Sequence, residues 1–280
     1  MTGRWGRCTA LLALSCLFGG CFGRPTADLA RSAASPVVSP KKGVGHWGRR
    51  LPGAPDLVGA SWYYNWSPRP KAAPGTVKAG FIPMVWGRHD VTDETLAQVR
   101  TAGYPALLTF NEPDGKGQAN MSVAEAIRLW PKLEATGLRL GSPATTTGAR
   151  WLDEFMDSAK AGGRRVDFIC LHWYGDITRD DPVGDLRNYL ARYWERYHLP
   201  IWLTEYSGAD FKYHRRRTTV KDNARFAAES AKMMEALPFI ERYAWFAPLV
   251  SPDDKSYGTV RLCLPDGTLT PVGLAYRDAR

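Results

Sequence analysis

The sequence lacks the residue patterns that would assign several common functions. Cysteine is scarce, with five among 280 residues, and no pair of Cys or His residues has the spacing of metal ligands. A Gly-rich phosphate loop is absent. Basic residues outnumber acidic ones by 37 − 28 = 9, but apart from the dense run at 212–217 and the terminus they are scattered, and they form no stripe interleaved with aromatic residues. The sequence therefore predicts no metal site, no cofactor and no nucleic-acid surface.

The N-terminal apolar stretch is too short to span a bilayer comfortably. Residues 8–21, CTALLALSCLFGGC, follow Arg4 and Arg7, and this order is typical of a secretory signal peptide. The end of the stretch, LFGGC, resembles a bacterial lipobox, although Phe18 stands where Leu is usual. We expect residues 1–21 to direct export to the extracellular space or the cell envelope. Acylation of Cys21 would give a lipid anchor, and the alternatives are simple secretion and a cytoplasmic chain.

The next segment reads as a tether. Residues 22–41 are rich in Pro, Ser and Ala and show no amphipathic period, so we expect a flexible linker. Removal of the first 21 residues would leave Cys170 and Cys263, and the sequence does not say whether these two thiols pair. Residues 42–280 are long enough for one barrel domain, and we expect a monomer.

Beyond the tether, short apolar runs alternate with helical segments. The helical segments have apolar residues at steps of three and four, and Ser122 with Glu125 has capping-box spacing. The eight runs are 43–47, 59–66, 80–87, 106–113, 138–144, 167–175, 200–207 and 243–248, and the helical segments are 92–103, 122–137, 148–163, 183–198 and 220–237. Residues 67–79 are too rich in Pro for a regular helix. This order predicts an α/β fold and, with eight runs, a single-domain (β/α)8 TIM barrel.

Two carboxylates stand at the ends of predicted strands. In this fold the active site lies at the carboxyl ends of the strands. Glu112 ends the fourth run, in TFNEPD, and Glu205 ends the seventh, in IWLTEYS, so we expect them on facing sides of one mouth. A carboxylate pair across an aromatic cleft is the equipment for glycoside hydrolysis, in which one group protonates the leaving oxygen and the other attacks the sugar or activates water. Taken alone, either Glu could be a surface or salt-bridged residue.

Aromatic and polar residues at the other strand ends are the expected sugar contacts. Sugar rings stack on indole and phenol rings, although the bland interpretation is that many of these rings pack the core. The candidates are Asn65, Trp86, Trp173, Tyr206 and Trp245, with Trp86, Trp173 and Trp245 ranked first. On the second strand, alternation puts Asn65 on one side and Tyr64 on the other, and the sequence does not say which side faces the mouth.

His172 is expected in the mouth as a fixed hydrogen-bond partner. The two carboxylates already cover the proton transfers, so a base role for His172 is not required.

The ordered set of strand-end motifs resembles glycoside hydrolase family 128. The motifs are SWYYNW, FIPMVWG, TFNEPD, GSPA, LHWYG, IWLTEYS and YAWFAP, and the similarity runs from about Gly43 to the last helix. Characterised members of that family are retaining endo-β-1,3-glucanases of the (β/α)8 clan that carries its acid after strand four and its nucleophile after strand seven. The resemblance implies a β-glucan substrate and no cofactor.

Carried over to this chain, the resemblance implies a role for each matching residue. Glu112 becomes the general acid/base and Glu205 the nucleophile, and Asn111 would bond the 2-hydroxyl of the sugar being cleaved. Tyr174 matches the clan's tyrosine that holds the nucleophile, and its alternative is a core tyrosine. Other functions remain open from the residues alone: hydrolysis of another β-glycan such as cellulose or mannan, and glycan binding by a non-catalytic lipoprotein. Endo or exo action is not predicted from the residues.

Overall fold

The computed structural model describes residues 38–280, apart from 49, 147–148, 212–213 and 215–216. Residues 38–280 form one compact unit. The expected signal peptide, with Cys21, and residues 22–37 of the expected tether lie outside the described residues. No helix in the described part of the chain is both long and apolar enough to cross a bilayer.

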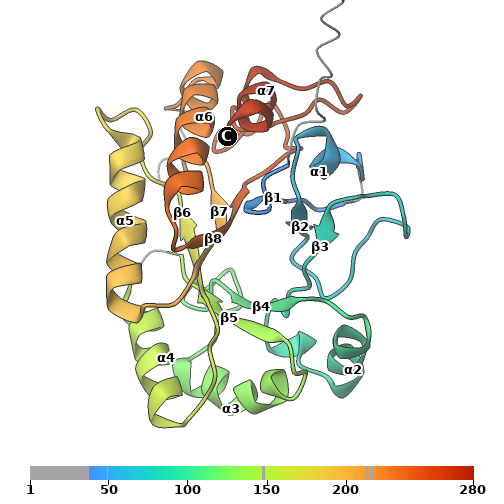
Figure 1. Cartoon of the computed structure of the whole chain (residues 1–280), viewed down its shortest axis with the longest axis vertical. Helices are drawn as coiled ribbons and strands as arrows, with labels where there is room; N and C mark the ends of the chain where they lie inside the picture. The colour runs from blue at the N-terminus through green and yellow to red at the C-terminus, as the bar shows by residue number, and fades with distance from the viewer. Residues whose placement is uncertain (1–37, 49, 147–148, 212–213, 215–216) are drawn as a thin grey trace, which may run out of the picture. The chain divides into compact units, whose positions relative to one another are not determined.

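Strands alternate with helices along the chain, as the sequence predicted (Figure 1). The described strands are β1 (Lys42–Gly45), β2 (Trp62–Tyr64), β3 (Gly80–Phe81), β4 (Ala106–Asn111), β5 (Arg139–Ala144), β6 (Ile169–Trp173), β7 (Ile201–Tyr206) and β8 (Ile240–Trp245). The helices are α1 (Ala54–Leu57), the 3-10 turn η1 (Arg88–Asp90), α2 (Asp93–Thr101), α3 (Val123–Glu134), α4 (Ala149–Ala161), α5 (Pro182–Tyr197), α6 (Val220–Ala236) and α7 (Pro271–Asp278). Every predicted run contains or overlaps a strand, while α1, η1 and α7 lie outside the predicted helical segments.

The strands are linked in chain order around a ring. Parallel ladders join β3, β2, β1, β8, β7 and β6 in that order, and a separate ladder joins β4 to β5. Single parallel bridges complete the circle, with Met84 opposite Leu108 between the third and fourth strands and Gly141 opposite Phe168 between the fifth and sixth. Because β8 pairs with β1, the ring closes, and the predicted (β/α)8 barrel is confirmed.

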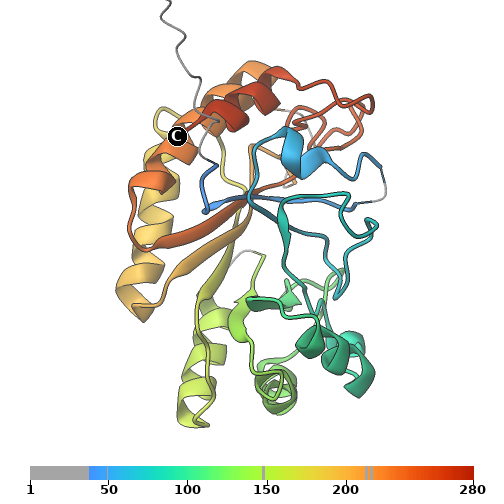
Figure 2. The same ribbon diagram turned by 45° about the vertical axis from the view of Figure 1, so that its right-hand side comes forward.

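Two apolar layers hold this ring together. One fills the barrel with aromatic side chains, among them Trp62, Phe168 and Trp202, and the other lies between the strands and the surrounding helices. Figure 2 shows the helices outside the strands, with α6 and α7 side by side. A solid interior means that the open space for a ligand lies at the end of the barrel.

The helix cap predicted at Ser122 forms, but the full capping box lies at another helix. Ser122 accepts a hydrogen bond from the Glu125 amide at 3.2 Å, but the Glu125 side chain pairs with Arg88 instead of returning to the cap. The full capping box is found at α6, where Thr219 and Asp222 bond each other's backbone amides.

Candidate active site

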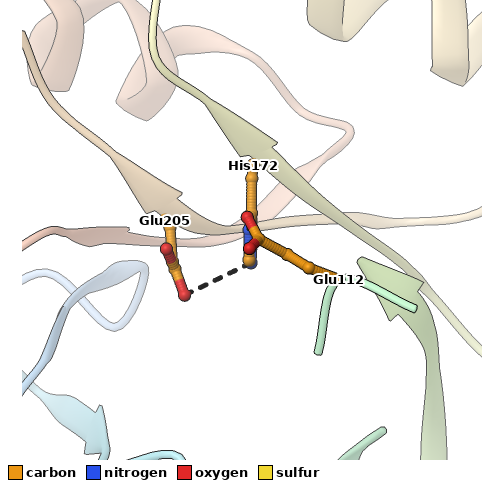
Figure 3. A group of neighbouring side chains, drawn as sticks. All are labelled: Glu112, His172 and Glu205. Atoms are coloured by element: carbon orange, nitrogen blue, oxygen red, sulfur yellow. Dashed lines mark hydrogen bonds and ion pairs between the residues drawn. The ribbon is translucent and has the colours of Figure 1, made fainter. Parts of the chain in front are cut away.

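Glu112 and Glu205 meet at the carboxyl end of the barrel. Glu205 lies within β7, and Glu112 follows β4 in a left-handed conformation with φ +46°. The Glu112 amide donates to the Ala144 carbonyl at 2.7 Å, which ties this turn to the end of β5. One side-chain oxygen of Glu112 and one of Glu205 lie within 4.8 Å of each other, with the ring of His172 between them (Figure 3).

His172 contacts both carboxylates. Its Nδ1 lies 2.9 Å from Oε1 of Glu112, and its Nε2 lies 3.5 Å from Oε1 of Glu205. A register shift between Leu171 and His172 in β6 aligns His172 with Glu205 on β7. Burial lowers the pKa of His172, but the two carboxylates outweigh that effect and leave the pKa raised above its ordinary value. The imidazole is thus biased toward the cation that both carboxylates favour.

Hydrogen-bond donors surround the carboxylate of Glu205. Tyr174 donates to Oε2 at 2.5 Å, and Trp66 and Tyr64 approach Oε1 at 2.7 and 3.2 Å. Burial, followed by the charge of Glu205, raises the pKa of both tyrosine hydroxyls well above 10, so they remain donors at neutral pH. Donors of this kind favour the ionised carboxylate, which is the form required of a nucleophile.

An aromatic cleft of about 1190 Å³ lies over the carboxylates. Its aromatic walls are Trp47, Trp66, Trp86, Tyr174, Phe211 and Phe246. Asn111 lies beside Glu112 at the floor, where its amide nitrogen is 3.3 Å from the side-chain oxygen of Gln118. The structure therefore brings Glu112, Glu205, Asn111, Tyr174 and Trp86 to one cavity, with His172 buried beneath it.

The structure corrects three aromatic predictions. Tyr206 and Trp245 have no exposed surface, and Trp173 stacks on Phe226 of α6 with ring centroids 5.3 Å apart. Strand alternation is the reason, because the residue that follows His172 or Glu205 must face the helices when its neighbour faces the mouth. The indole N–H of Trp245 also donates a hydrogen bond to the Val260 carbonyl.

Asn65 is also misplaced by the prediction. Its side chain is 1% exposed, does not line the cleft, and donates to the backbone carbonyl of Arg69 in the following loop. The mouth is faced by Tyr64 and Trp66 instead, which occupy the other parity of the second strand and its extension.

Trp47, Trp66 and Phe246 also line the cleft, although the sequence analysis did not select them as sugar contacts. Trp47 and Trp66 end the first and second runs, where the barrel mouth was expected, and Phe246 lies within the last run. The backbone conformation that turns Trp66 into the cleft was not predictable. Trp66 has φ +54°, a left-handed value that residues other than glycine rarely adopt and that no local sequence pattern predicts.

The three central groups also meet a loose criterion for holding a metal ion. Glu112, His172 and Glu205 each offer a ligand atom within 4.8 Å of the others. However, the two carboxylates lie against opposite ring nitrogens of His172, whereas one ion would need both beside the same nitrogen. Donors from Trp66 and Tyr174 also occupy the two oxygens of Glu205. The arrangement therefore favours acid/base and nucleophilic chemistry over ion binding.

Comparisons with known proteins agree with this geometry. A family model described as the glycosyl hydrolase catalytic core matches residues 56–276. The crystal structure of a GH128 (subgroup I) endo-β-1,3-glucanase from Amycolatopsis mediterranei, in complex with laminaritriose, shares 43% identity, covers 85% of this chain and 99% of that chain, and has a TM-score of 0.77. A subgroup II endo-β-1,3-glucanase from Sorangium cellulosum shares 30% identity over 86% of this chain and 98% of that chain, with a TM-score of 0.74.

A curated relative is more distant and much longer. Alkali-sensitive linkage protein 1 of Schizosaccharomyces pombe is 29% identical over 230 residues, which is 78% of this chain and 40% of that protein. The chain therefore spans about 40% of the length of that relative. From the family match and the 43% identical structure, the chain belongs to the glycosyl hydrolase catalytic core family and, within it, to glycoside hydrolase family 128.

Proposed function

We propose that the protein is a retaining endo-β-1,3-glucanase. The observation that carries the proposal is the approach of one oxygen of Glu112 and one of Glu205 to within 4.8 Å on the floor of an aromatic cleft. Retaining glycosidases hold their two carboxyl groups about 5 to 5.5 Å apart, whereas inverting enzymes need about 6.5 to 9.5 Å to admit a water. The subgroup I relative, an endo-β-1,3-glucanase, was solved with laminaritriose and, as a variant, with laminarihexaose.

The first half of the reaction forms a glycosyl ester. A carboxylate oxygen of Glu205 attacks the anomeric carbon while Glu112 gives its proton to the glycosidic oxygen, so the C–O bond breaks and the leaving chain departs as an alcohol. Tyr174 and Trp66 hold the Glu205 carboxylate in place as its charge falls. His172 remains beside Glu112, and its cationic form stabilises the carboxylate of Glu112 once the proton has left.

The second half hydrolyses the ester. Glu112, now ionised, takes a proton from water, whose oxygen attacks the anomeric carbon and releases Glu205 as the carboxylate. Two inversions at one carbon give net retention. Asn111 is placed beside Glu112 on the cleft floor, where its amide can bond the 2-hydroxyl of the sugar as positive charge develops in the ring.

Reducing-sugar release from laminarin tests the activity. Glu205→Ala and Glu112→Ala should each lower turnover by several orders of magnitude, while Glu195→Ala, which changes an exposed glutamate of α5, should not. Release of long oligosaccharides early in the reaction would support endo action. Turnover of cellulose or mannan without laminarin would favour the other β-glycan hydrolases, and no turnover of any glycan despite binding would favour a non-catalytic lipoprotein.

We also propose export as a monomer, with Cys21 as a lipid anchor. The support is the sequence alone: basic residues, then the short apolar stretch 8–21 that ends in LFGGC. The intact mass of the exported protein should correspond to a chain that begins at an acylated Cys21, and an unmodified N-terminus elsewhere would contradict the anchor. Size-exclusion chromatography with light scattering checks the monomer.

A further inference from the structure

Among the described residues, the indole of Trp66 is the one donor whose hydrogen bond goes to Oε1 of Glu205 alone. Its Nε1 lies 2.7 Å from that oxygen. The Tyr64 hydroxyl approaches the same oxygen at 3.2 Å, but it lies 3.0 Å from the Thr204 carbonyl as well and has a single proton to give. His172 Nε2 is 3.5 Å away, too far for a strong hydrogen bond.

The surrounding residues fix the position of this ring. Trp66 has φ +54°, which turns its side chain back over the barrel mouth after β2. A Cβ at Gly45 would lie 2.9 Å from Cη2 of Trp66, so only glycine at that position of β1 leaves the indole its place. Trp47 stacks on the other side with centroids 4.9 Å apart and an interplanar angle of 27°. Stacking on Trp47 and the close approach of β1 at Gly45 therefore fix the ring with its N–H directed at Glu205.

An indole is an unusual partner for a carboxylate that must react. It donates one hydrogen bond, accepts none and does not ionise in the working range, so it cannot exchange a proton with Glu205 as an imidazole could. Its bond is strongest to the ionised carboxylate and weakens when the ester forms. Tyr174 holds the other oxygen in the same way.

We propose that Trp66 is a positioning residue, which holds Oε1 of Glu205 by a hydrogen bond and fixes the rotation of this carboxylate for attack on the anomeric carbon. The inference rests on the proposed function and adds to it the residue that orients the nucleophile. Gly45 takes part indirectly, because it makes room for the indole.

Covalent labelling of Glu205 tests the positioning role of Trp66 without a contribution from the general acid Glu112. The reagent is a 2-deoxy-2-fluoro-laminaribiosyl fluoride, whose fluoride leaves without protonation by Glu112 and whose sugar stays on the nucleophile. Trp66→Phe should slow inactivation at saturating reagent by about 10- to 100-fold, the worth of a hydrogen bond to a charged acceptor. Trp194→Phe makes the same indole-to-phenyl change on α5, where the ring stacks on Phe239, and should leave the rate unchanged.

The pH profile separates positioning from a general loss of structure. The groups that face Glu205 are Tyr64, Glu112, His172 and Tyr174. With the Trp66 donor removed, the acidic limb of kcat/KM should move to higher pH, because the ionised carboxylate loses a bond. A purely structural lesion would lower kcat/KM equally at all pH values. Benzothienylalanine at position 66 keeps the ring and replaces N–H by sulfur, so it should reproduce both effects in a fully folded protein.

The outcomes separate the two proposals. If the parent protein is not labelled on Glu205, the retaining mechanism itself is wrong. If the parent is labelled and both the Trp66→Phe and the benzothienylalanine proteins react at the parent rate with an unmoved acidic limb, Trp66 has no positioning role and the proposed function stands.

Discussion

At the scale of single residues, two buried histidines respond to acid in opposite directions. Burial lowers the pKa of His46 to about 4, and the backbone near Leu51 offsets only part of this effect. His172 has its pKa raised by the carboxylates around it. A raised pKa gives stability that is fully present below about pH 6.5 and is lost as the pH rises through the folded value. The contribution of His172 to the free energy of unfolding therefore stays constant between pH 6.5 and 4, whereas the contribution of His46 falls as the pH drops.

The acid sensitivity of the fold should depend on His46. Its unfolded pKa of about 6.5 exceeds the folded value, so the unfolded chain binds more protons in this window and the free energy of unfolding falls as the pH drops. The loss from pH 6.5 to 4 is on the order of 3 kcal/mol. Urea unfolding of the parent and of His46→Phe at pH 7 and 4.5 checks this. An equal loss in both proteins would show that His46 is not responsible.

The residue scale also explains which parts of the site were predictable. Glu112 and Glu205 were found because a charged residue at the end of an apolar run is conspicuous and parallel strands bring such ends together. Trp173 and Tyr206 were wrongly placed in the cleft because each follows a site residue by one position, and that single step turns a side chain to the opposite face. The direction of the Trp66 side chain depends on the left-handed backbone conformation of Trp66 itself, and tertiary packing determines that conformation.

At the scale of elements, two adjacent lysines fasten the start of the barrel to its last helices. Lys41 donates to three carbonyls at the end of α6, those of Met234, Glu235 and Leu237, at 2.9 to 3.3 Å. Lys42 donates to the carbonyls of Tyr276, Arg277 and Ala279 at the end of α7. The last carbonyls of a helix have no partner within the helix, and a cation there satisfies them and complements the helix dipole. Residues 38–41, expected in the tether, thus begin the compact unit.

Removal of either ammonium group should destabilise the fold. Lys42→Met leaves buried carbonyls unpaired and should lower the free energy of unfolding by about 1 to 3 kcal/mol, with a smaller loss for the less buried Lys41→Met. Lys232→Met, on the exposed face of α6, is the matched control. Denaturant midpoints measure the three variants, and equal midpoints for Lys42→Met and Lys232→Met would contradict the capping role.

Elements were the most predictable level of the structure. All eight runs contain or overlap strands, because short apolar runs that alternate with helical segments form the buried parallel strands of an α/β fold. The helix cap at Ser122 was half right, since Arg88 from a distant turn competes for the Glu125 side chain. Local sequence spacing does not contain such a partner. The 3-10 turn that presents Arg88 was missed for the same reason.

At the scale of the whole molecule, an aromatic stack occupies the barrel interior away from the mouth. Trp202 stacks on Phe168 with centroids 4.2 Å apart, contacts Trp62, and carries the guanidinium of Arg242 4.5 Å above its ring. Burial lowers the pKa of Arg242. Arg139 and Glu241 form a bidentate pair at 2.6 and 2.8 Å that links β5 to β8. These contacts brace the ring that sets the distance between the carboxylates.

Truncation of Trp202 tests this bracing. Trp202→Ala opens a cavity in the barrel and should cost about 3 to 5 kcal/mol of unfolding free energy, whereas Trp202→Phe keeps a ring and should cost less. Urea unfolding gives both values. A loss below about 1 kcal/mol for the alanine variant would mean that the barrel collapses around the gap and that the stack is dispensable.

The central claim is that a closed ring of strands brings Glu112 and Glu205 close enough for double displacement on one sugar. Proton NMR of a laminari-oligosaccharide during its first minutes of hydrolysis measures the configuration of the new reducing end before mutarotation. The account predicts that the β anomer appears first and converts to the α anomer later. An α anomer as the first product would show inversion and contradict it.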